Sequence, residues 1–202
     1  MQRGLLIVIS GPSGVGKNTI INNLFIHLPN LKYSISATTR SPRPNEIDGQ
    51  HYFFLSEPDF TKQIATGAFI EWAQVYQHYY GTPKAKVQEM LAAGFDVILD
   101  IDVQGALKIK RELPEAILIF LSPPSVSELK RRLLGRQTEA EAEVNRRLQY
   151  INIEFETAPY YDYFVVNTEI SLTCQQIECI ILAEKFKVCR QETGFLDKII
   201  KE

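Results

Sequence analysis

The sequence has few of the residues that build disulfide frameworks or metal clusters. It has three cysteines, Cys174, Cys179 and Cys189, all near the C-terminal end, and no Cys-x-x-Cys pair. An odd number in this arrangement is unlike a disulfide scaffold, so we expect buried or incidental thiols in a reducing compartment. The three histidines are scattered along the chain and form no pattern of zinc ligands.

Long apolar runs and a strong net charge are also lacking. No stretch approaches the roughly 20 apolar residues of a membrane helix, and the first apolar run, residues 5–9, is too short for a signal peptide. The formal net charge is −2, unlike the basic balance of proteins that coat nucleic acids or membranes. We expect a cytoplasmic protein that binds neither, with its 202 residues in one domain.

Short apolar runs alternate with helical patterns along the chain. The runs are residues 5–9, 95–101, 116–121 and 163–166. Continuous apolar runs of this length are typical of strands buried on both faces of a parallel sheet. Helices are predicted at residues 19–28, 103–111 and 172–188. The alternation predicts an α/β fold with a parallel-sheet core and helices on both faces.

Two regions interrupt this alternation. Residues 34–82 are rich in Thr, Ser, Pro, Tyr and Phe, which predicts a small mixed β lobe with one short helix near residues 57–66. Residues 125–157 show apolar positions at helical spacing and predict two helices. We predict a single domain, 1–202, in which both lobes are inserted into a core of residues 1–33, 83–124 and 158–202.

A glycine-rich segment follows the first predicted strand. Gly11-Pro12-Ser13-Gly14-Val15-Gly16-Lys17-Asn18 fits the pattern G-x-x-x-x-G-K between a strand and a helix. Its glycines let backbone N–H groups face inward, the helix N-terminus adds partial positive charge, and Lys17 can reach the β- and γ-phosphates. The alternative is a turn that holds a lysine by chance, but the context favours a loop that binds a nucleoside triphosphate.

The end of this loop departs from the usual pattern. The residue after the lysine is normally Ser or Thr, whose hydroxyl holds Mg²⁺, whereas here it is Asn18, followed by Thr19. The Asn18 side-chain oxygen could meet Mg²⁺ or its water, with the ion held mainly by phosphates and by carboxylates elsewhere. Whether Thr19 contributes is left open.

Two carboxylates close the second long apolar run. Asp100 and Asp102 stand where ligands bind in parallel sheets, beyond the carboxyl end of a strand. They are predicted to face Mg²⁺, its water or an acceptor, although Asp102 also suits a helix N-cap. Residues 102–105 match the D-x-x-G pattern of regulatory GTPases, but no Asn-Lys-x-Asp motif accompanies it.

The first inserted lobe holds groups suited to a nucleotide. Arg40 and Arg43 lie in a proline-stiffened loop, and arginine forks suit phosphate oxygens. Glu71 lies inside an apolar strand, where a carboxylate needs hydrogen-bond donors such as the two N–H groups of guanine. Tyr52 and Tyr80 could donate to the phosphate, and Ser36 and Thr82 to the base.

These motifs together resemble the guanylate kinase family, whose members phosphorylate GMP with ATP. The resemblance runs from Gly11 to about Asn167. It is carried by residues 36–43, 69–73, 79–81, 99–105 and 135–139. It implies an ATP- and Mg²⁺-dependent enzyme with a core, a GMP-binding lobe and a lid. The implied substrate-binding residues are Ser36, Arg40, Arg43, Tyr52, Glu71, Tyr80, Thr82, Asp100, Asp102 and Gly105, and the implied ATP-binding residues are Gly11, Pro12, Ser13, Gly14, Val15, Gly16, Lys17, Asn18 and Thr19. Asn18 and Asp100 are the implied Mg²⁺ contacts.

Five arginines crowd the second lobe: Arg131, Arg132, Arg136, Arg146 and Arg147. They suit a lid that brings positive charge over the moving phosphoryl group. The resemblance implies catalytic roles for Lys17, Arg132, Arg136 and Arg147. The alternative is a solvated helix face, with pairs such as Glu128–Arg132.

The resemblance leaves two other functions open. One is an inert domain of this family that binds protein partners, and the other is a related kinase with another acceptor. The presence of Lys17 and of both arginines of the 34–82 lobe disfavours the inert domain. The last helix, Cys174–Arg190, could serve self-association or only cover the sheet.

Overall fold

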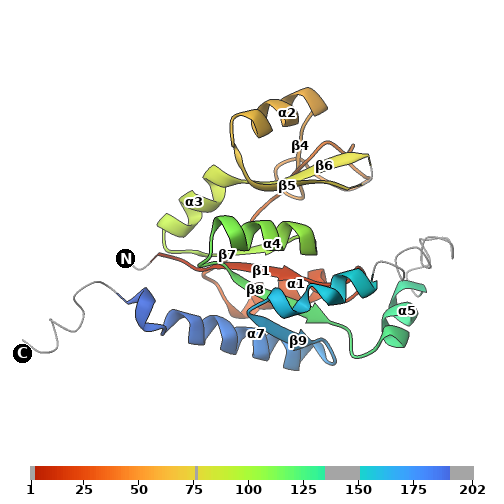
Figure 1. Cartoon of the computed structure of the whole chain (residues 1–202), viewed down its shortest axis with the longest axis vertical. Coiled ribbons are helices and arrows are strands. Elements are labelled where there is room, and N and C mark those ends of the chain that lie inside the picture. Colours follow the sequence, from red (N-terminus) through yellow and green to blue (C-terminus); the bar gives the residue numbers. More distant parts are fainter. Residues whose placement is uncertain (1–2, 76, 135–150, 192–202) are drawn as a thin grey trace, which may run out of the picture.

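A five-stranded parallel sheet forms the centre of the protein in the computed structural model (Figure 1). The structure describes residues 3–75, 77–134 and 151–191. In spatial order the strands are β2 (Leu31–Tyr33), β7 (Asp96–Asp100), β1 (Leu6–Ser10), β8 (Ile117–Ser122) and β9 (Tyr163–Val166). The four predicted strands are confirmed. The short edge strand β2 was not predicted, because two of its three residues are exposed and it has no apolar run.

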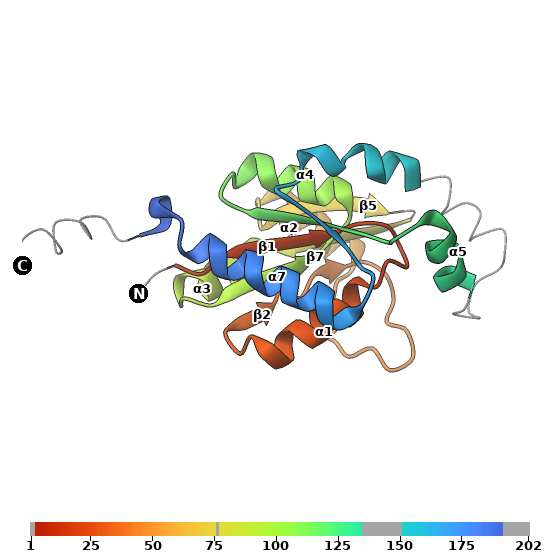
Figure 2. The same cartoon turned by 90° about the horizontal axis from the view of Figure 1, so that it is seen from below.

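Helices cover both faces of this sheet, which confirms the predicted fold class. On one face lie α1 (Lys17–His27) and α7 (Ile170–Lys185), side by side in Figure 2. On the other lie α3 (Lys84–Ala92) and α4 (Val103–Glu112). Successive side chains of β1 point to opposite faces of the sheet. Ile7 packs in the hydrophobic cluster on the side of α1 and α7, and Val8 packs in the cluster on the side of α3 and α4. Helix α3 was not predicted, because only Val87 and Leu91 of its residues are buried.

A smaller mixed sheet stands beside the core, with α2 packed on it (Figure 1). Its strands, in spatial order, are β4 (Phe53–Phe54), β3 (Ala37–Thr38), β6 (His78–Pro83) and β5 (Phe69–Val75). Helix α2 (Glu57–Ala65) begins where the Ser56 side chain accepts a hydrogen bond from the Asp59 N–H. The Phe60 ring stacks on Phe69 at 4.5 Å between centroids. This sheet therefore has a small core of its own, next to the core sheet.

The second predicted lobe is described only in part. Helix α5 (Val126–Leu134) and a helical segment at 151–156 pack together through Leu129, Leu133 and Ile151. A 3₁₀ turn at Ala158–Tyr160 then leads to β9. Arg136, Arg146 and Arg147 lie outside the described residues. The division of the chain into core, GMP-binding lobe and lid stays a prediction.

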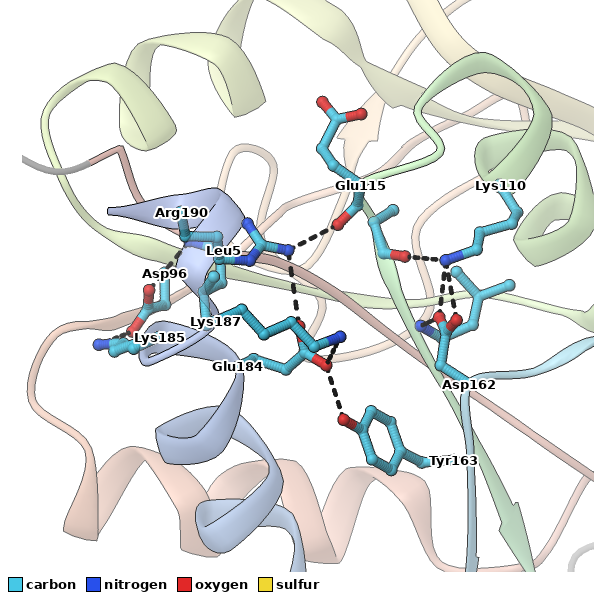
Figure 3. Close-up of polar contacts among 12 residues, drawn as sticks. Leu5, Asp96, Lys110, Glu115, Asp162, Tyr163, Glu184, Lys185, Lys187 and Arg190 are labelled. Carbon is cyan, nitrogen blue, oxygen red and sulfur yellow. Dashed lines mark hydrogen bonds and ion pairs between the residues drawn. The ribbon is translucent and has the colours of Figure 1, made fainter. Parts of the chain in front are cut away.

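Polar contacts close the edge of the core sheet where the strands begin (Figure 3). Asp96 accepts from the Leu5 N–H at 3.0 Å and pairs with Lys185 at 2.6 Å. The buried Glu184 accepts from the Tyr163 hydroxyl at 2.6 Å. A last 3₁₀ turn, Val188–Arg190, continues these contacts beyond α7. The amino ends of the strands are thus occupied by structural ion pairs, which leaves the carboxyl ends for a site.

The cysteines are all free, as predicted, with Cys174 buried and the other two exposed. In the part of the chain that the structure describes, no helix combines the length and apolarity needed to span a membrane.

Candidate active site

The glycine-rich loop joins β1 to α1 at the carboxyl edge of the core sheet. Gly11, Gly14 and Gly16 have φ angles of 143°, 88° and 104°, which side-chain-bearing residues rarely adopt. A Cβ on Gly11 would lie 2.1 Å from the Leu121 carbonyl oxygen, so the loop needs glycine there for space as well. Lys17 Nζ donates to the Gly11 carbonyl at 2.7 Å, which places the ammonium group over the loop.

Helix α1 begins at Lys17, two residues before the predicted start. Gly16 is its N-cap in a left-handed conformation, and no side chain caps the first turn. Uncapped N–H groups at a helix N-terminus are suited to an anion such as phosphate. Asn18 and Thr19 lie exposed on this first turn, and their predicted roles stay predictions.

A cleft of about 190 Å³ opens between the core and the smaller sheet. It brings together six of the predicted substrate-binding residues: Ser36, Tyr52, Glu71, Tyr80, Asp100 and Asp102. They come from β5, β6, the end of β7, the loop between β7 and α4, and the loops before β3 and β4. Residues up to 66 positions apart in sequence, Ser36 and Asp102, therefore share one cavity, as the parallel-sheet reasoning predicted for the two aspartates.

Glu71 is a buried carboxylate with one side-chain donor. It is 7% exposed and accepts from the hydroxyl of the fully buried Thr82 at 2.8 Å. Burial raises the pKa of Glu71 to about 7, although the Thr82 hydrogen bond opposes this. A Cβ on Gly105 would lie 2.9 Å from Glu71 Oε2, so a larger residue in the first turn of α4 would displace this carboxylate. The carboxylate is fixed in place, and the hydrogen bonds that it accepts from Thr82 do not offset the effect of burial on its pKa.

Arg40 is held by a residue that the sequence did not single out. Glu46 pairs with Arg40 Nη2 at 2.9 Å, and its other oxygen accepts from the Arg43 N–H at 2.7 Å. The Arg40 hydrogen bond, and then that from Arg43, lower the pKa of Glu46 to about 2. The Arg40 guanidinium lies 5.5 Å from the centre of the Tyr52 ring. Glu46 follows Arg43 by three residues, and that spacing within a proline-rich loop was the signal available for it.

Arg40 and Tyr80 approach the same region, whereas Arg43 is exposed. The Tyr52 and Tyr80 rings lie 6.1 Å apart. A hydrogen bond that Arg40 donates to the Tyr80 hydroxyl contributes to raising the pKa of Arg40, after the larger contribution from Glu46. The Arg43 side chain lies on the surface of its loop. Tyr52, Tyr80 and Arg40 are thus grouped as predicted. Arg43 is connected to this group by its backbone N–H, which donates to Glu46.

Asp100 and Asp102 connect the cleft to the glycine-rich loop of residues 11–18, which we call the phosphate loop. Asp102 caps α4 by accepting from the Gly105 N–H at 2.7 Å, which confirms the N-cap, and it also lines the cleft, where its role as a ligand stays a prediction. Burial raises the pKa of Asp100, and the positive charge of Lys17 opposes the rise. Burial also raises the pKa of Glu154, again opposed by Lys17. Glu154 was not predicted as part of the site.

Arg132 lies beneath the phosphate loop. It pairs with Glu128 at 2.8 Å, as expected from their spacing, and Nη1 donates to the Val15 carbonyl at 3.0 Å. Nη2 donates to the Asn167 carbonyl at 3.2 Å. The neighbouring Arg131 is exposed and also pairs with Glu128. The catalytic role of Arg132 stays a prediction, and its contacts tie α5 to the loop.

Comparison with known proteins agrees with this arrangement. The sequence profile described as "Guanylate kinase" matches residues 3–184. The chain is 46% identical over 202 residues to a guanylate kinase of Clostridioides difficile, covering 100% of this chain and 98% of that protein. It is 49% identical over 195 residues to one of Caldanaerobacter subterraneus, covering 96% and 95%. A crystal structure of guanylate kinase from Anaplasma phagocytophilum superposes with a TM-score of 0.80 at 32% identity, covering 98% of this chain and 94% of that one. The chain belongs to the guanylate kinase family.

Proposed function

We propose that this protein transfers the γ-phosphoryl group of ATP to GMP, and also to dGMP, to give ADP and GDP or dGDP. The observation that carries this is the union of two half-sites at one edge of the core sheet. The glycine-rich loop with Lys17 is suited to a triphosphate, and a cleft next to it contains a buried carboxylate, Glu71. The raised pKa of Asp100, opposed by Lys17, supports their adjacency.

The donor half-site recognises phosphate rather than base. ATP phosphates would lie against residues 11–19, facing the backbone N–H groups that all of these except Pro12 carry, with Lys17 between the β- and γ-phosphates. In the described part of the chain, the Lys17 ammonium group donates to the Gly11 and Pro12 carbonyls, at 2.7 and 3.4 Å. It can therefore turn toward a phosphate with little rearrangement.

The acceptor half-site is suited to a guanine nucleotide. An ionised Glu71 would accept from two adjacent N–H groups of guanine, while Ser36 and Thr82 provide hydroxyls. Adenine presents an acceptor at the corresponding ring nitrogen, so it would leave the buried carboxylate without a donor. The cost in binding free energy would be about 1 to 3 kcal/mol. Arg40, Arg43, Tyr52 and Tyr80 would hold the GMP phosphate.

Transfer itself needs positioning and charge rather than covalent chemistry by the protein. The acceptor phosphate oxygen would attack the γ-phosphorus in line, and the bond to the ADP oxygen would break. Lys17 would stabilise the charge, together with Arg132, Arg136 and Arg147, of which the last two lie outside the described residues. Closure of the 125–157 lobe would exclude water.

Mg²⁺ fits this site as an ion held mainly by phosphates and water. In the described residues, no group of three or more His, Cys, Asp or Glu side chains is placed to bind a metal ion by itself. Asp100, directly or through water, and Asn18, through its side-chain oxygen, would be the protein contacts. Bound there, Mg²⁺ would neutralise charge on the β- and γ-phosphates. We place the reaction in cytoplasmic purine metabolism, where the free thiols suit a reducing compartment.

A coupled assay of ADP release tests the proposal. The purified protein is assayed with ATP and Mg²⁺ against GMP, dGMP, AMP and UMP in turn. Turnover with GMP and dGMP, and at least about 100-fold lower kcat/KM with AMP and UMP, is expected. Higher kcat/KM with AMP or UMP would indicate a kinase with another acceptor. No turnover with any of them would indicate an inert domain of the family.

A further inference from the structure

Asn167 lies buried where four segments of the protein meet. It follows β9, is 4% exposed, and its N–H donates to the Ser122 carbonyl at 2.7 Å. Its side-chain Nδ2 donates to the carbonyl of Val15 in the phosphate loop at 2.8 Å. The Thr173 hydroxyl of α7 donates to Asn167 Oδ1 at 3.2 Å. One side chain therefore connects α7 to the phosphate loop.

These contacts determine which way the amide faces. The Thr173 hydroxyl can donate to an oxygen, and the Val15 carbonyl can only accept. With the amide reversed, Oδ1 would face the Val15 carbonyl oxygen, and two acceptors would meet in a buried place. Thr173 is fully buried and serves the amide from the first turn of α7. It thus holds the NH₂ group of Asn167 toward the loop.

The carbonyl of Val15 is held from two sides. Besides Asn167 Nδ2, it accepts from Arg132 Nη1 at 3.0 Å. None of the described peptide bonds is cis, so the carbonyl of Val15 and the N–H of Gly16 point in opposite directions from one rigid plane. A carbonyl fixed toward Asn167 therefore directs the Gly16 N–H away from Asn167.

Gly16 is shaped for this arrangement. Its φ of 104° is left-handed, and a Cβ there would lie 2.7 Å from Asn167 Nδ2. Only glycine lets the loop pass this close to the amide. Because Gly16 directly precedes Lys17 at the start of α1, its N–H stands at the helix end suited to phosphate.

We infer that Asn167 is a positioning residue for the phosphate loop, which fixes the Val15–Gly16 peptide so that the Gly16 N–H donates to a phosphate of ATP. The inference rests on the proposed function only in that the loop binds the phosphates of a nucleotide. Asn167 acts through the peptide, so its effect depends on phosphate and is independent of the base and of GMP.

The test compares two asparagines with the same kind of hydrogen bond. Asn167→Ala removes the donor to Val15. Asn30→Ala is the matched control, because Asn30 Nδ2 donates to the Gly94 carbonyl at 2.9 Å, away from the loop. Calorimetry measures the affinity of each full-length variant for ATP, inorganic tripolyphosphate and GMP. Asn167→Ala is expected to weaken the binding of ATP and of tripolyphosphate about tenfold, because the Gly16 N–H would lose its charge-assisted hydrogen bond to phosphate. The affinity for GMP should be unchanged. Asn30→Ala is expected to leave all three unchanged.

A second pair of variants tests the same peptide from α7. Thr173→Val keeps the shape and removes the hydroxyl that orients the amide, whereas Thr173→Ser keeps the hydroxyl. The first is expected to weaken tripolyphosphate binding about threefold to tenfold and the second to restore it. In wild type, tripolyphosphate should shift the amide resonance of Gly16, and Asn167→Ala should reduce that shift. This pair decides the matter if Asn167→Ala fails to fold.

The outcomes separate this inference from the proposed function. Wild-type affinity for tripolyphosphate in Asn167→Ala, or in Thr173→Val where Asn167→Ala fails to fold, would overturn the inference, whatever the kinase assay gives. Equal losses for tripolyphosphate and GMP would also overturn it, because they would indicate a general disturbance of the fold. A selective loss of tripolyphosphate binding in a protein that phosphorylates no nucleotide would support the inference while rejecting the proposed function.

Discussion

The phosphate loop and the acceptor cleft are built by different parts of the chain. The loop offers mainly backbone: three glycines with positive φ, an uncapped helix N-terminus and one lysine. The cleft offers side chains, among them a carboxylate whose pKa is raised to about 7. Backbone N–H groups do not titrate near neutral pH and recognise charge without regard to the base. A buried carboxylate such as Glu71 would recognise the base in the proposed function, and that recognition would depend on pH.

The two regions also differ in their support. The loop follows β1, whose five residues are all buried between two strands and two layers of helices. The cleft borders a smaller sheet in which β3 and β4 have two residues each. Changes at the loop should therefore affect transfer with every acceptor, whereas changes at the cleft should affect the choice of acceptor and leave ATP binding intact.

The largest expected effect is that of Lys17→Ala. Removing the only lysine of the loop removes charge at the β- and γ-phosphates, and kcat should fall about 10³-fold or more with GMP as acceptor. The far-UV circular dichroism should be unchanged, because the Lys17 side chain is not part of the core clusters. Lys86→Ala, at an exposed ion pair, is the control. Near-normal turnover of Lys17→Ala would reject the role of the loop.

Glu71→Gln should have a smaller effect, confined to the cleft. A carboxylate can accept from both guanine N–H groups, whereas the glutamine amide has one oxygen that accepts and one NH₂ group that donates. The ratio of kcat/KM for GMP to that for AMP should therefore fall about 10- to 100-fold. KM for ATP should stay unchanged. The exposed Glu89→Gln is the control. An unchanged GMP-to-AMP ratio would reject Glu71 as the guanine reader.

The same variant gives a pH test of the comparison. The pKa of Glu71, about 7, lies above the usual value of 4.5, so its share of folding stability is present below pH 4.5 and lost as pH rises through 7. Thermal unfolding should therefore find Glu71→Gln more stable than wild type at pH 8, by on the order of 2 kcal/mol, and little different at pH 5.

GMP binding should show the opposite trend, because guanine favours the ionised carboxylate. The affinity of wild type for GMP, relative to Glu71→Gln, should rise from pH 6 to pH 8. The GMP phosphate also ionises near pH 6, but this is common to both proteins and cancels in the ratio. A ratio that does not change with pH would show that Glu71 does not titrate in this range.

Glu46→Gln should give the smallest effect. It keeps an acceptor for the Arg43 N–H but removes the charge that pairs with Arg40. Arg40 would then be held less firmly over Tyr52, and KM for GMP should rise about threefold to tenfold with kcat nearly unchanged. Glu57→Gln on the surface of α2 is the control. A fall in KM would instead show that Glu46 competes with the GMP phosphate for Arg40.

Much of the fold could be predicted from local pattern. The strands β1, β7, β8 and β9 are continuous apolar runs, and Glu57–Ala65 has a serine cap before a helical pattern. Both signals depend on neighbouring residues, which is why they can be found in sequence. Strand β2 and helix α3 could not, because each has few buried residues and is stabilised by its place against the core sheet.

The sequence by itself determined the phosphate loop, since glycine positions, a lysine and the flanking elements follow one another along the chain. It also supplied the types of residue that suit a guanine nucleotide, such as Glu71. Tertiary structure alone decided which distant groups meet. Glu46 holds Arg40, Gly105 makes room for Glu71, and Asn167 reaches Val15 across 152 positions. The reason is physical: these contacts depend on how strands and helices pack in space, and packing distances leave no regular spacing in the sequence.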